Sequence, residues 1–199
     1  MQKEIQKIVL ASASPRRKEI LKEMNVVFTV EPSLYEEDNA QDLLPEELVK
    51  QQARGKAAEV ARRISSKFPV LGADTIVVLD GKVLGKPQNK AEAAQMLSLL
   101  SGRTHEVLTG VAVILGKTMR SGVARTKVSF RNISKADIDA YIETGEPMDK
   151  AGAYAIQGIG GQFVKEIYGS RSNVIGLPKA LTLTLLEEIG YGDDTGNGG

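Results

Sequence analysis

A long strand–turn–strand pattern near the middle of the chain limits the fold more than any other feature of the sequence. Two strand-like runs, Val107–Leu115 and Gly122–Phe130, flank a turn at Gly116 and Lys117. The pattern predicts two long strands that pair as a hairpin. Because strands and helices also alternate elsewhere in the chain, this hairpin is expected to lie at the centre of a larger sheet.

Shorter strands and helices alternate on both sides of the hairpin. Apolar runs predict strands, and apolar residues at helical spacing predict helices. The predicted strands are Ile8–Ala11, Val26–Val30, Val70–Gly72, Ile76–Leu79 and Gln162–Ile167. The predicted helices begin at Pro15, at Pro45 and after Ser134, or span Ala91–Leu100 and Pro178–Ile189. The alternation predicts an α/β fold with an elongated, bent mixed β-sheet flanked by helices.

Capping and turn signals support several of these boundaries. Ser14 before Pro15 is typical of a helix N-terminus, and Ser134 with Asp137 resembles a capping box. Asp80-Gly81 predicts a two-residue hairpin turn. No low-complexity linker divides the chain, so residues 1–190 are predicted to form a single domain. The Gly- and Asp-rich residues 191–199 are predicted to be a disordered tail.

Composition and charge exclude several classes of function. The 199 residues include 26 Lys and Arg against 25 Asp and Glu, and the net charge of +1 argues against binding to nucleic acids or membrane surfaces. The absence of Cys and the single His exclude disulfides, thiolate chemistry and multi-histidine metal sites. The chain has no signal-peptide pattern and no apolar segment of membrane-span length. We therefore expect a cytoplasmic protein.

The first candidate site is the segment Ser12–Arg17, which directly follows a predicted strand. Arg16 and Arg17 would lie in the first turn of a helix, at the positive end of its dipole, which costs stability unless an anion is present. A phosphate group there would be held by backbone N–H groups, serine hydroxyls and two guanidinium groups. An N-cap serine with two solvated arginines fits the same pattern, and both interpretations remain open.

The second candidate site is Gly72–Thr75, which lies between two apolar runs. The carboxylate of Asp74 would be expensive to bury there unless it binds a cation or takes part in catalysis. An aspartate that caps its own turn is the structural alternative. A haloacid dehalogenase-type nucleophile is excluded, because that chemistry needs a second acid two residues later, where this chain has Ile76.

Two further segments could let a ligand approach the backbone closely. Lys86, between a glycine and a proline, could aim its ammonium group at a phosphate, although a solvated lysine in a turn is the better interpretation of this residue alone. Asp149–Gly158 combines small residues with polar ones, among them Gln157, and a glycine-rich turn explains it equally. His105 is predicted to be a structural residue at a strand edge, since no Cys and no nucleophile-elbow motif accompanies it.

Taken together, these segments resemble the Maf family of nucleoside triphosphate pyrophosphatases from Leu10 to about Pro178. Each motif is short, but their order and spacing are highly specific. The resemblance is carried by Ser12-Ala-Ser-Pro-Arg-Arg17, Glu36-Glu37, Lys56, Gly72-Ala-Asp-Thr75, Gly85-Lys-Pro87 and Asp149-Lys-Ala-Gly-Ala-Tyr-Ala-Ile-Gln-Gly158.

The resemblance implies a fold, an activity and an assembly. The fold is an elongated mixed sheet with two lobes around a central cleft, similar to that of the inosine triphosphatase family. The activity is hydrolysis of a nucleoside triphosphate between its α- and β-phosphates, which gives a monophosphate and pyrophosphate. The family often forms dimers, so a homodimer is expected, and its name refers to inhibition of septum formation.

Three positions point to one branch of the family. Arg16, Thr75 and Gln157 match the specificity positions of the branch that looks like a dTTP/UTP pyrophosphatase. Such a polar trio fits a pyrimidine with two carbonyls and one N–H, since a glutamine offers both a donor and an acceptor. The resemblance therefore implies dTTP and UTP as substrates, with modified pyrimidine nucleotides as further candidates.

The resemblance also implies a role for each site residue. Ser12, Arg17, Lys56 and Lys86 would bind the triphosphate. Asp74 would act as the general base or orient the attacking water through a divalent cation. Glu36 or Glu37 would complete the metal shell, with Glu37 nearer the matching position. Because the chain has no Cys and one His, the metal is expected to be bound by oxygen atoms, as Mg²⁺ or Mn²⁺ are.

A nucleotide-binding regulator of cell division with little catalysis is the alternative to an enzyme. The combination of an acid, basic groups and phosphate ligands argues against it, because a sensor has no need of Asp74 beside a phosphate cradle.

Overall fold

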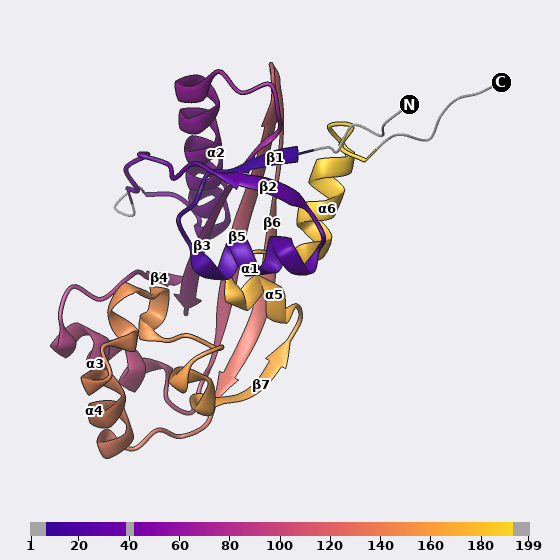
Figure 1. Cartoon of the computed structure of the whole chain (residues 1–199). Helices are drawn as coiled ribbons and strands as arrows, with labels where there is room; N and C mark the ends of the chain where they lie inside the picture. Colours follow the sequence, from indigo (N-terminus) through magenta and orange to yellow (C-terminus); the bar gives the residue numbers. More distant parts are fainter. Residues whose placement is uncertain (1–6, 39–41, 193–199) are drawn as a thin grey trace.

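The computed structural model describes residues 7–38 and 42–192, which form one mixed seven-stranded sheet with helices around it (Figure 1). The strand order is β2-β1-β3-β5-β6-β7, and β4 pairs with β3 off this path. The strands are β1 (Lys7–Leu10), β2 (Val27–Val30), β3 (Val70–Leu79), β4 (Lys82–Leu84), β5 (Thr104–Leu115), β6 (Thr118–Phe130) and β7 (Val164–Tyr168). The helices are α1 (Pro15–Glu23), α2 (Pro45–Ile64), α3 (Lys90–Leu100), α4 (Lys135–Glu143), α5 (Arg171–Ile175) and α6 (Lys179–Glu187), with three 3₁₀ turns at Glu146–Asp149, Ala151–Ala153 and Ile159–Phe163. The predicted α/β fold with an elongated mixed sheet is confirmed.

The predicted central hairpin is present as β5 and β6, the two longest strands of the sheet (Figure 1). They pair from Leu115 opposite Thr118 to Thr104 opposite Ser129. The second strand begins earlier than expected, because its first residues are exposed and mostly polar and show no apolar run. The predicted Asp80-Gly81 turn is also confirmed, since it joins β3 to β4.

Strand β3 corrects one expectation from the sequence. Two short runs separated by a turn at Asp74 were among the interpretations, but the strand continues without a break and pairs with β5 from Val70 to Val78. Asp74 therefore lies in the middle of a central strand and is 4% exposed. The turn interpretation fails because an ammonium group accompanies the carboxylate, as the site geometry below shows.

One edge of β3 is free over a short stretch. Strand β1 pairs with β3 only at Val70 and Leu71, and β4 pairs with it only from Val77 onward. Residues 72–76 thus have a sheet neighbour on one side alone. Strand β1 lies between β2 and β3 and runs parallel to both. The chain adds β2 on one side of β1 and β3 on the other, so the order of strands reverses beside β1. Such switch points are where α/β sheets bind ligands.

Helices α1 and α2 pack against opposite faces of β3. Leu71 and Ala73 pack in one cluster with Ile20 and Leu21 of α1. Ile76, on the other face, packs with residues of α2. Consecutive residues of a strand point to opposite faces of the sheet, so their side chains can border one cavity where the edge of the strand is free. Asp74 and Thr75 can therefore border one cleft.

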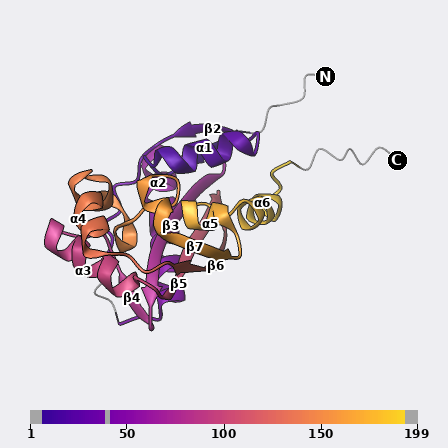
Figure 2. The same ribbon diagram turned by 90° about the horizontal axis from the view of Figure 1, so that it is seen from below.

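The hydrophobic core has two large parts, one in each half of the molecule. One part is formed by α3, α4 and the adjoining ends of β5 and β6, and the other by α1, α6, β1 and β3. Figure 2 shows α3 and α4 at one end of the sheet and α6 at the other. Tyr191 packs at the edge of the second part. Residues 193–199 of the predicted tail lie outside the described residues.

The remaining differences from prediction are local. Helix α5 was not predicted, because its five residues are too few to show a helical period. Strand β7 begins at Val164, since the residues before it form a 3₁₀ turn. No helix among residues 7–38 and 42–192 is long and apolar enough to cross a membrane.

Two glycines let α2 pack directly on the sheet. A Cβ atom at Gly72 of β3 would lie 2.5 Å from the carbonyl oxygen of Ala53 and 2.7 Å from the amide nitrogen of Ala57. A Cβ at Gly110 of β5 would lie 2.4 Å from the carbonyl oxygen of Val49. These contacts are with backbone atoms, which cannot rotate away. The helix and the sheet therefore approach each other as closely as glycine allows.

We expect Gly72→Ala to destabilise the fold by about 1–3 kcal/mol, the usual cost of an added methyl group in a packed interior. The methyl group would move α2 away from β3, because its nearest neighbours are backbone atoms. Urea denaturation of the wild type and the variant measures the free energy of unfolding. An unchanged unfolding midpoint would show that α2 can shift at no cost.

Candidate active site

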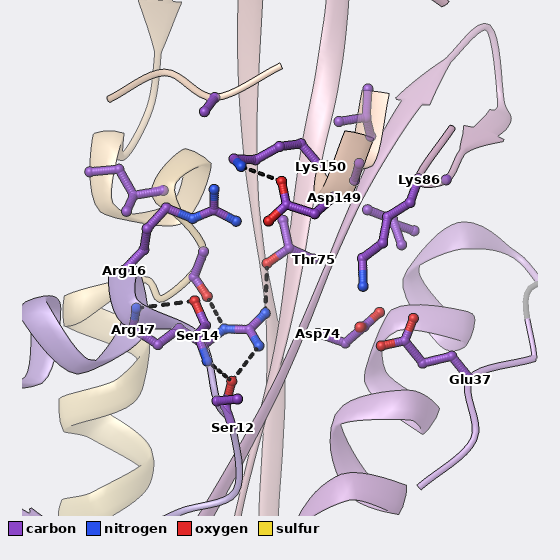
Figure 3. Close-up of a pocket in the computed structure, with 18 of the residues that line it drawn as sticks. Ser12, Ser14, Arg16, Arg17, Glu37, Asp74, Thr75, Lys86, Asp149 and Lys150 are labelled. Atoms are coloured by element: carbon purple, nitrogen blue, oxygen red, sulfur yellow. Dashed lines mark hydrogen bonds and ion pairs between the residues drawn. The ribbon is translucent and has the colours of Figure 1, made fainter. Parts of the chain in front are cut away.

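A cleft of about 990 Å³ opens at the free edge of β3, between the two halves of the molecule (Figure 3). Its walls come from α1, α2, β3, the segment after β4 and the 3₁₀ turns before β7. Except for Glu36, the candidate site residues that the sequence indicated line this one cleft: Ser12, Arg16, Arg17, Glu37, Lys56, Asp74, Thr75, Lys86 and Gln157. Segments far apart in the chain are thus brought together as expected.

Lys56 of α2 joins the two carboxylates of the cleft. Its Nζ atom lies 2.6 Å from Oε1 of Glu37 and 2.7 Å from Oδ1 of Asp74. The side chains of Lys56 and Asp74 are 11% and 6% exposed, so this pair is largely removed from water. The second oxygen of Asp74, Oδ2, is buried and has no hydrogen-bond partner among the described residues. One carboxylate oxygen is therefore held by an ion pair, while the other is unengaged.

The surrounding cations keep Glu37 ionised. Burial alone would raise the pKa of its carboxyl group, but Lys56 acts against this, followed by Lys86 and Arg17, and the pKa ends below its usual value. Glu37 thus carries its charge at neutral pH in spite of its partly buried position. Glu36 does not line the cleft.

The loop that carries Glu37 is fixed to α2 by a second set of polar contacts. Glu59 accepts hydrogen bonds from the Ser33 hydroxyl at 3.0 Å and from the Leu34 amide at 2.9 Å. Arg63 pairs with Glu59 at 2.6 Å and also donates to the carbonyl of Pro32 at 2.8 Å. The hydrogen bond from Arg63 is the main reason that the pKa of Glu59 falls to about 2. The loop is thereby held where Glu37 reaches Lys56.

Arg17 is held in place by neutral acceptors. Its Nε donates to the carbonyl of Gly176 at 2.8 Å, and its two terminal nitrogens donate to the hydroxyls of Ser12 at 3.1 Å and Thr75 at 3.3 Å. The guanidinium group points into the cleft (Figure 3). Burial lowers the pKa of Arg17, and the charge of Asp74 partly offsets this. The interpretation of Arg17 as a solvated side chain is therefore wrong, while the predicted N-cap at Ser14 is confirmed.

Lys86 reaches the cleft from the opposite wall. Its ammonium group points toward Glu37 and Asp74 (Figure 3). The segment that carries it is held by a hydrogen bond of 3.1 Å from the amide of Gly152 to the carbonyl of Gly85. Gly152 has a φ of +67°, and a Cβ atom there would lie 2.9 Å from Val77. The small residues before Gln157 thus bring two loops into contact, as the sequence suggested.

Arg16 and Gln157 complete the lining. The Nε atom of Arg16 is buried and has no hydrogen-bond partner among the described residues. Gln157 is exposed at the rim, in a segment fixed by Glu146. The carboxylate of Glu146 accepts hydrogen bonds of 3.0 Å from the amides of Ile159 and Gly160. Burial would raise the pKa of Glu146, but these backbone N–H groups hold it below the usual value.

The sequence did not reveal the residues that support the site. Glu59 and Glu146, which fix the loops of Glu37 and Gln157, show no distinguishing pattern in the sequence. Thr109 and Asn173, which are both 0% exposed and connect Thr75 to α5, are equally unremarkable there. All four act through contacts with residues distant in the chain, which local patterns do not report.

The donor set fits an oxygen-bound divalent cation. Among residues 7–38 and 42–192 no group of three or more His, Cys, Asp or Glu side chains could hold a metal by itself. Glu37 and Asp74 nevertheless share one ammonium group, and Oδ2 of Asp74 is unpartnered. Two carboxylates that leave several positions open suit Mg²⁺ or Mn²⁺, which bind few protein ligands and take the rest from water and phosphate oxygens.

His105 lies outside the cleft and is structural, as predicted. Its Nε2 atom lies 2.8 Å from the hydroxyl of Tyr154, and its ring packs edge-on against Phe130 at 4.8 Å between centroids. The residue is 1% exposed, and this burial lowers its pKa from 6.5 to about 4. His105 is therefore neutral in the folded protein at neutral pH.

We expect stability to fall as the pH drops from about 6.5 to about 4, in a way that depends on His105. The unfolded chain binds a proton at its His in this range, whereas the folded protein does not until about pH 4. The contribution is fully present above pH 6.5 and amounts to about 3 kcal/mol. Denaturation of the wild type and His105→Gln between pH 7.5 and 4 measures the difference between the two profiles. Parallel profiles would contradict this origin of the pH dependence.

Comparison with known proteins gives a consistent result over almost the whole chain. The profile of a family described as Maf-like protein matches residues 7–189. Proteins named dTTP/UTP pyrophosphatase are 47% identical in Halalkalibacterium halodurans, 50% identical in Moorella thermoacetica and 46% identical in Symbiobacterium thermophilum. The matches cover 92%, 92% and 98% of this chain and 96%, 95% and 100% of the relatives.

One solved structure resembles the chain more distantly. The crystal structure of a dITP/XTP pyrophosphatase from Mycobacterium abscessus is 14% identical, with a TM-score of 0.46, over 92% of this chain and 96% of that one. A likeness at this level carries no argument about the site.

Proposed function

The chain belongs to the Maf family, and we propose that it is a nucleoside triphosphate pyrophosphatase that hydrolyses dTTP and UTP to the monophosphate and pyrophosphate. Relatives at 44–50% identity that carry this activity in their names support the substrate. Modified pyrimidine nucleotides are further candidates, because they present the same edge of the base.

The observation that carries the proposal is a set of three cations in one cleft. Arg16, Arg17 and Lys86 line the cleft and form no ion pair with any carboxylate of the described residues. Cations that lack a salt-bridge partner raise the positive potential of the cleft, which favours the binding of an anion. A triphosphate is such an anion, and it would lie beside the Asp74 carboxylate. A site for binding alone would not need that carboxylate there.

The phosphate groups would be bound from two sides. Arg17 and Ser12 would hold them from the N-terminus of α1, where backbone N–H groups and the helix dipole also favour negative charge. Lys86 would approach from the other wall, on the side of Glu37 and Asp74. Charges arranged before the substrate binds stabilise the charge that develops on the phosphates during transfer.

Asp74 would activate the attacking water, either as its general base or by orienting it through a divalent cation. Lys56 holds its Oδ1 atom, which orients the carboxylate, and leaves Oδ2 able to accept a proton from an attacking water. Lys56 itself is engaged by both carboxylates, so its first role would be to position them. A contact of Lys56 with phosphate stays a prediction.

A divalent cation is a general requirement of such enzymes, and we assign Mg²⁺ or Mn²⁺ to the carboxylates of Glu37 and Asp74. When bound, the cation would neutralise phosphate charge and polarise the anhydride that is cleaved. The choice of Glu37 over Glu36 follows from its ion pair with Lys56.

Arg16, Thr75 and Gln157 would recognise the base. They lie on different walls of the cleft and offer a guanidinium, a hydroxyl and an amide group. Assembly as a homodimer and a cytoplasmic location stay predictions of the family resemblance, and analytical ultracentrifugation would test the first.

We expect Asp74→Asn to lower kcat for pyrophosphate release from dTTP by about 10²–10⁴-fold, the usual contribution of a general base. The amide keeps the shape of the side chain but cannot accept the proton. Asp139→Asn, on the exposed face of α4, is the matched control and should retain full activity. The measurement is pyrophosphate release with Mg²⁺. Unchanged turnover in Asp74→Asn would remove this residue from the chemistry.

We expect Gln157→Glu to lower kcat/KM for dTTP and UTP by about tenfold, and to affect GTP less. The substitution replaces an amide donor by a carboxylate, which repels a carbonyl on the base. Gln162→Glu is the control, because it makes the same change at an exposed residue outside the cleft. An equal loss for all nucleotides would show that Gln157 supports the loop and does not read the base.

A further inference from the structure

A chain of buried hydroxyl groups leads from the cleft to α5. The Oγ1 atom of Thr75 lies 2.9 Å from Oγ1 of Thr109, and Oγ1 of Thr109 lies 3.1 Å from the backbone carbonyl oxygen of Asn173. Thr109 and Asn173 are 0% exposed, so water does not compete for these hydrogen bonds. Thr75 is the member of the chain that borders the cleft.

The direction of these hydrogen bonds follows from donor counting. A carbonyl oxygen can only accept, so the single hydroxyl hydrogen of Thr109 is donated to Asn173. Thr109 must then accept in its contact with Thr75, and the hydroxyl hydrogen of Thr75 is donated to Thr109. The hydroxyl of Thr75 then has no hydrogen left to donate into the cleft. Toward a ligand, Thr75 is an acceptor and not a donor.

The contact with Arg17 agrees with this direction. The Nη2 atom of Arg17 donates to Oγ1 of Thr75 at 3.3 Å, which uses Thr75 as an acceptor. The end of the chain is itself immobile, because the Asn173 side chain donates to the Val107 carbonyl at 3.1 Å and to the Thr126 hydroxyl at 2.9 Å. The polarity of Thr75 is thus set by β5, β6 and α5 before any ligand enters.

We propose that Thr109 is a positioning residue that fixes Thr75 as a hydrogen-bond acceptor, and that Thr75 thereby selects a base with a hydrogen on N3. This inference rests on the proposed function, and it adds the means by which the site distinguishes pyrimidines. Uracil and thymine carry a hydrogen on N3, whereas N3 of cytosine is an acceptor and would meet the lone pairs of Thr75. Thr109 itself touches no ligand.

The neighbouring groups complete the same pattern. The Nε of Arg16 is a buried donor without a partner among the described residues, and Gln157 can supply an amide donor from the rim. Two donors and one acceptor in the same cleft match in number the carbonyl, N–H and carbonyl groups of uracil and thymine. Cytosine presents an amino group in place of one carbonyl, so two of the three contacts would be mismatched.

The test is the ratio of kcat/KM for UTP to that for CTP in Thr109→Val and Thr109→Ser. Valine has the shape of threonine but offers Thr75 no acceptor, so the Thr75 hydroxyl becomes free to donate into the cleft. We expect the ratio to fall by about tenfold in Thr109→Val, the effect of one hydrogen bond. Thr109→Ser keeps the hydroxyl and should retain the wild-type ratio. The carbonyl of Asn173 stays paired in both variants, because the Gly176 amide also donates to it at 3.0 Å.

A matched control separates this effect from a loss of packing. Thr182 is also 0% exposed, but its hydroxyl has no partner among the described residues, so Thr182→Val makes the same change without touching the hydroxyl chain. It should leave the ratio unchanged. Thermal unfolding of all variants shows whether each one folds.

The possible results decide between the claims. A ratio that is the same in Thr109→Val and the wild type, or that falls equally in Thr182→Val, would overturn the role of Thr109. Failure of the wild type to hydrolyse UTP or dTTP would instead overturn the proposed function. Since the first comparison is made between variants and the second within the wild type, the two failures are distinguishable.

Discussion

The site depends on the ion pair between Lys56 and Asp74. A carboxylate in the middle of a central strand would be too costly to bury without a partner, and the ammonium group at 2.7 Å provides one. Lys56 can reach it only because α2 lies directly on β3, and that approach requires glycine at Gly72 and small residues such as Ala57 facing it. The packing of the helix and the ion pair of the site therefore depend on each other. Any change that moves α2 away from the sheet also separates Lys56 from Asp74.

The gap between β1 and β4 determines which residues meet in the cleft. A strand inside a sheet directs neighbouring side chains to opposite faces, where helices cover them. Over residues 72–76 the missing neighbour lets both faces open to the same space. Asp74 faces the α2 side with its lysine, and Thr75 faces the α1 side with Arg17. The same gap thus places the acid and the anion-binding group on two walls of one cavity without any distortion of the strand.

Local patterns in the sequence predicted the central hairpin, the caps at Ser14 and Ser134 and the cleft residues Arg17 and Asp74, because each of these carries its own signal within a few residues. Glu37 and Lys56 were indicated only by the family resemblance. The continuity of β3 was not predictable in this way, since Asp74 interrupts an apolar run and its partner Lys56 lies in another element. Helix α5 was missed because its five residues are too few to show a helical period, and the contacts of Thr109 were missed because its partners lie in other elements. Their roles depend on residues more than 30 positions away, and a single sequence shows no link between them.

The cations of the cleft differ in how they are held, and this separates their roles. Lys56 forms ion pairs with two carboxylates, which cancel most of the attraction that its positive charge would exert on a ligand. Arg17 is instead held by a carbonyl and two hydroxyl groups, which fix its direction but carry no net charge. Neutral acceptors orient a guanidinium group without weakening its attraction for an anion, whereas a carboxylate partner would have to be displaced before a phosphate could bind. The burial of Arg17 is the cost of this arrangement, because an unpaired charge is removed from water. Only a ligand that brings negative charge to the same place recovers that cost, which is why the arrangement suits a phosphate site better than a structural one.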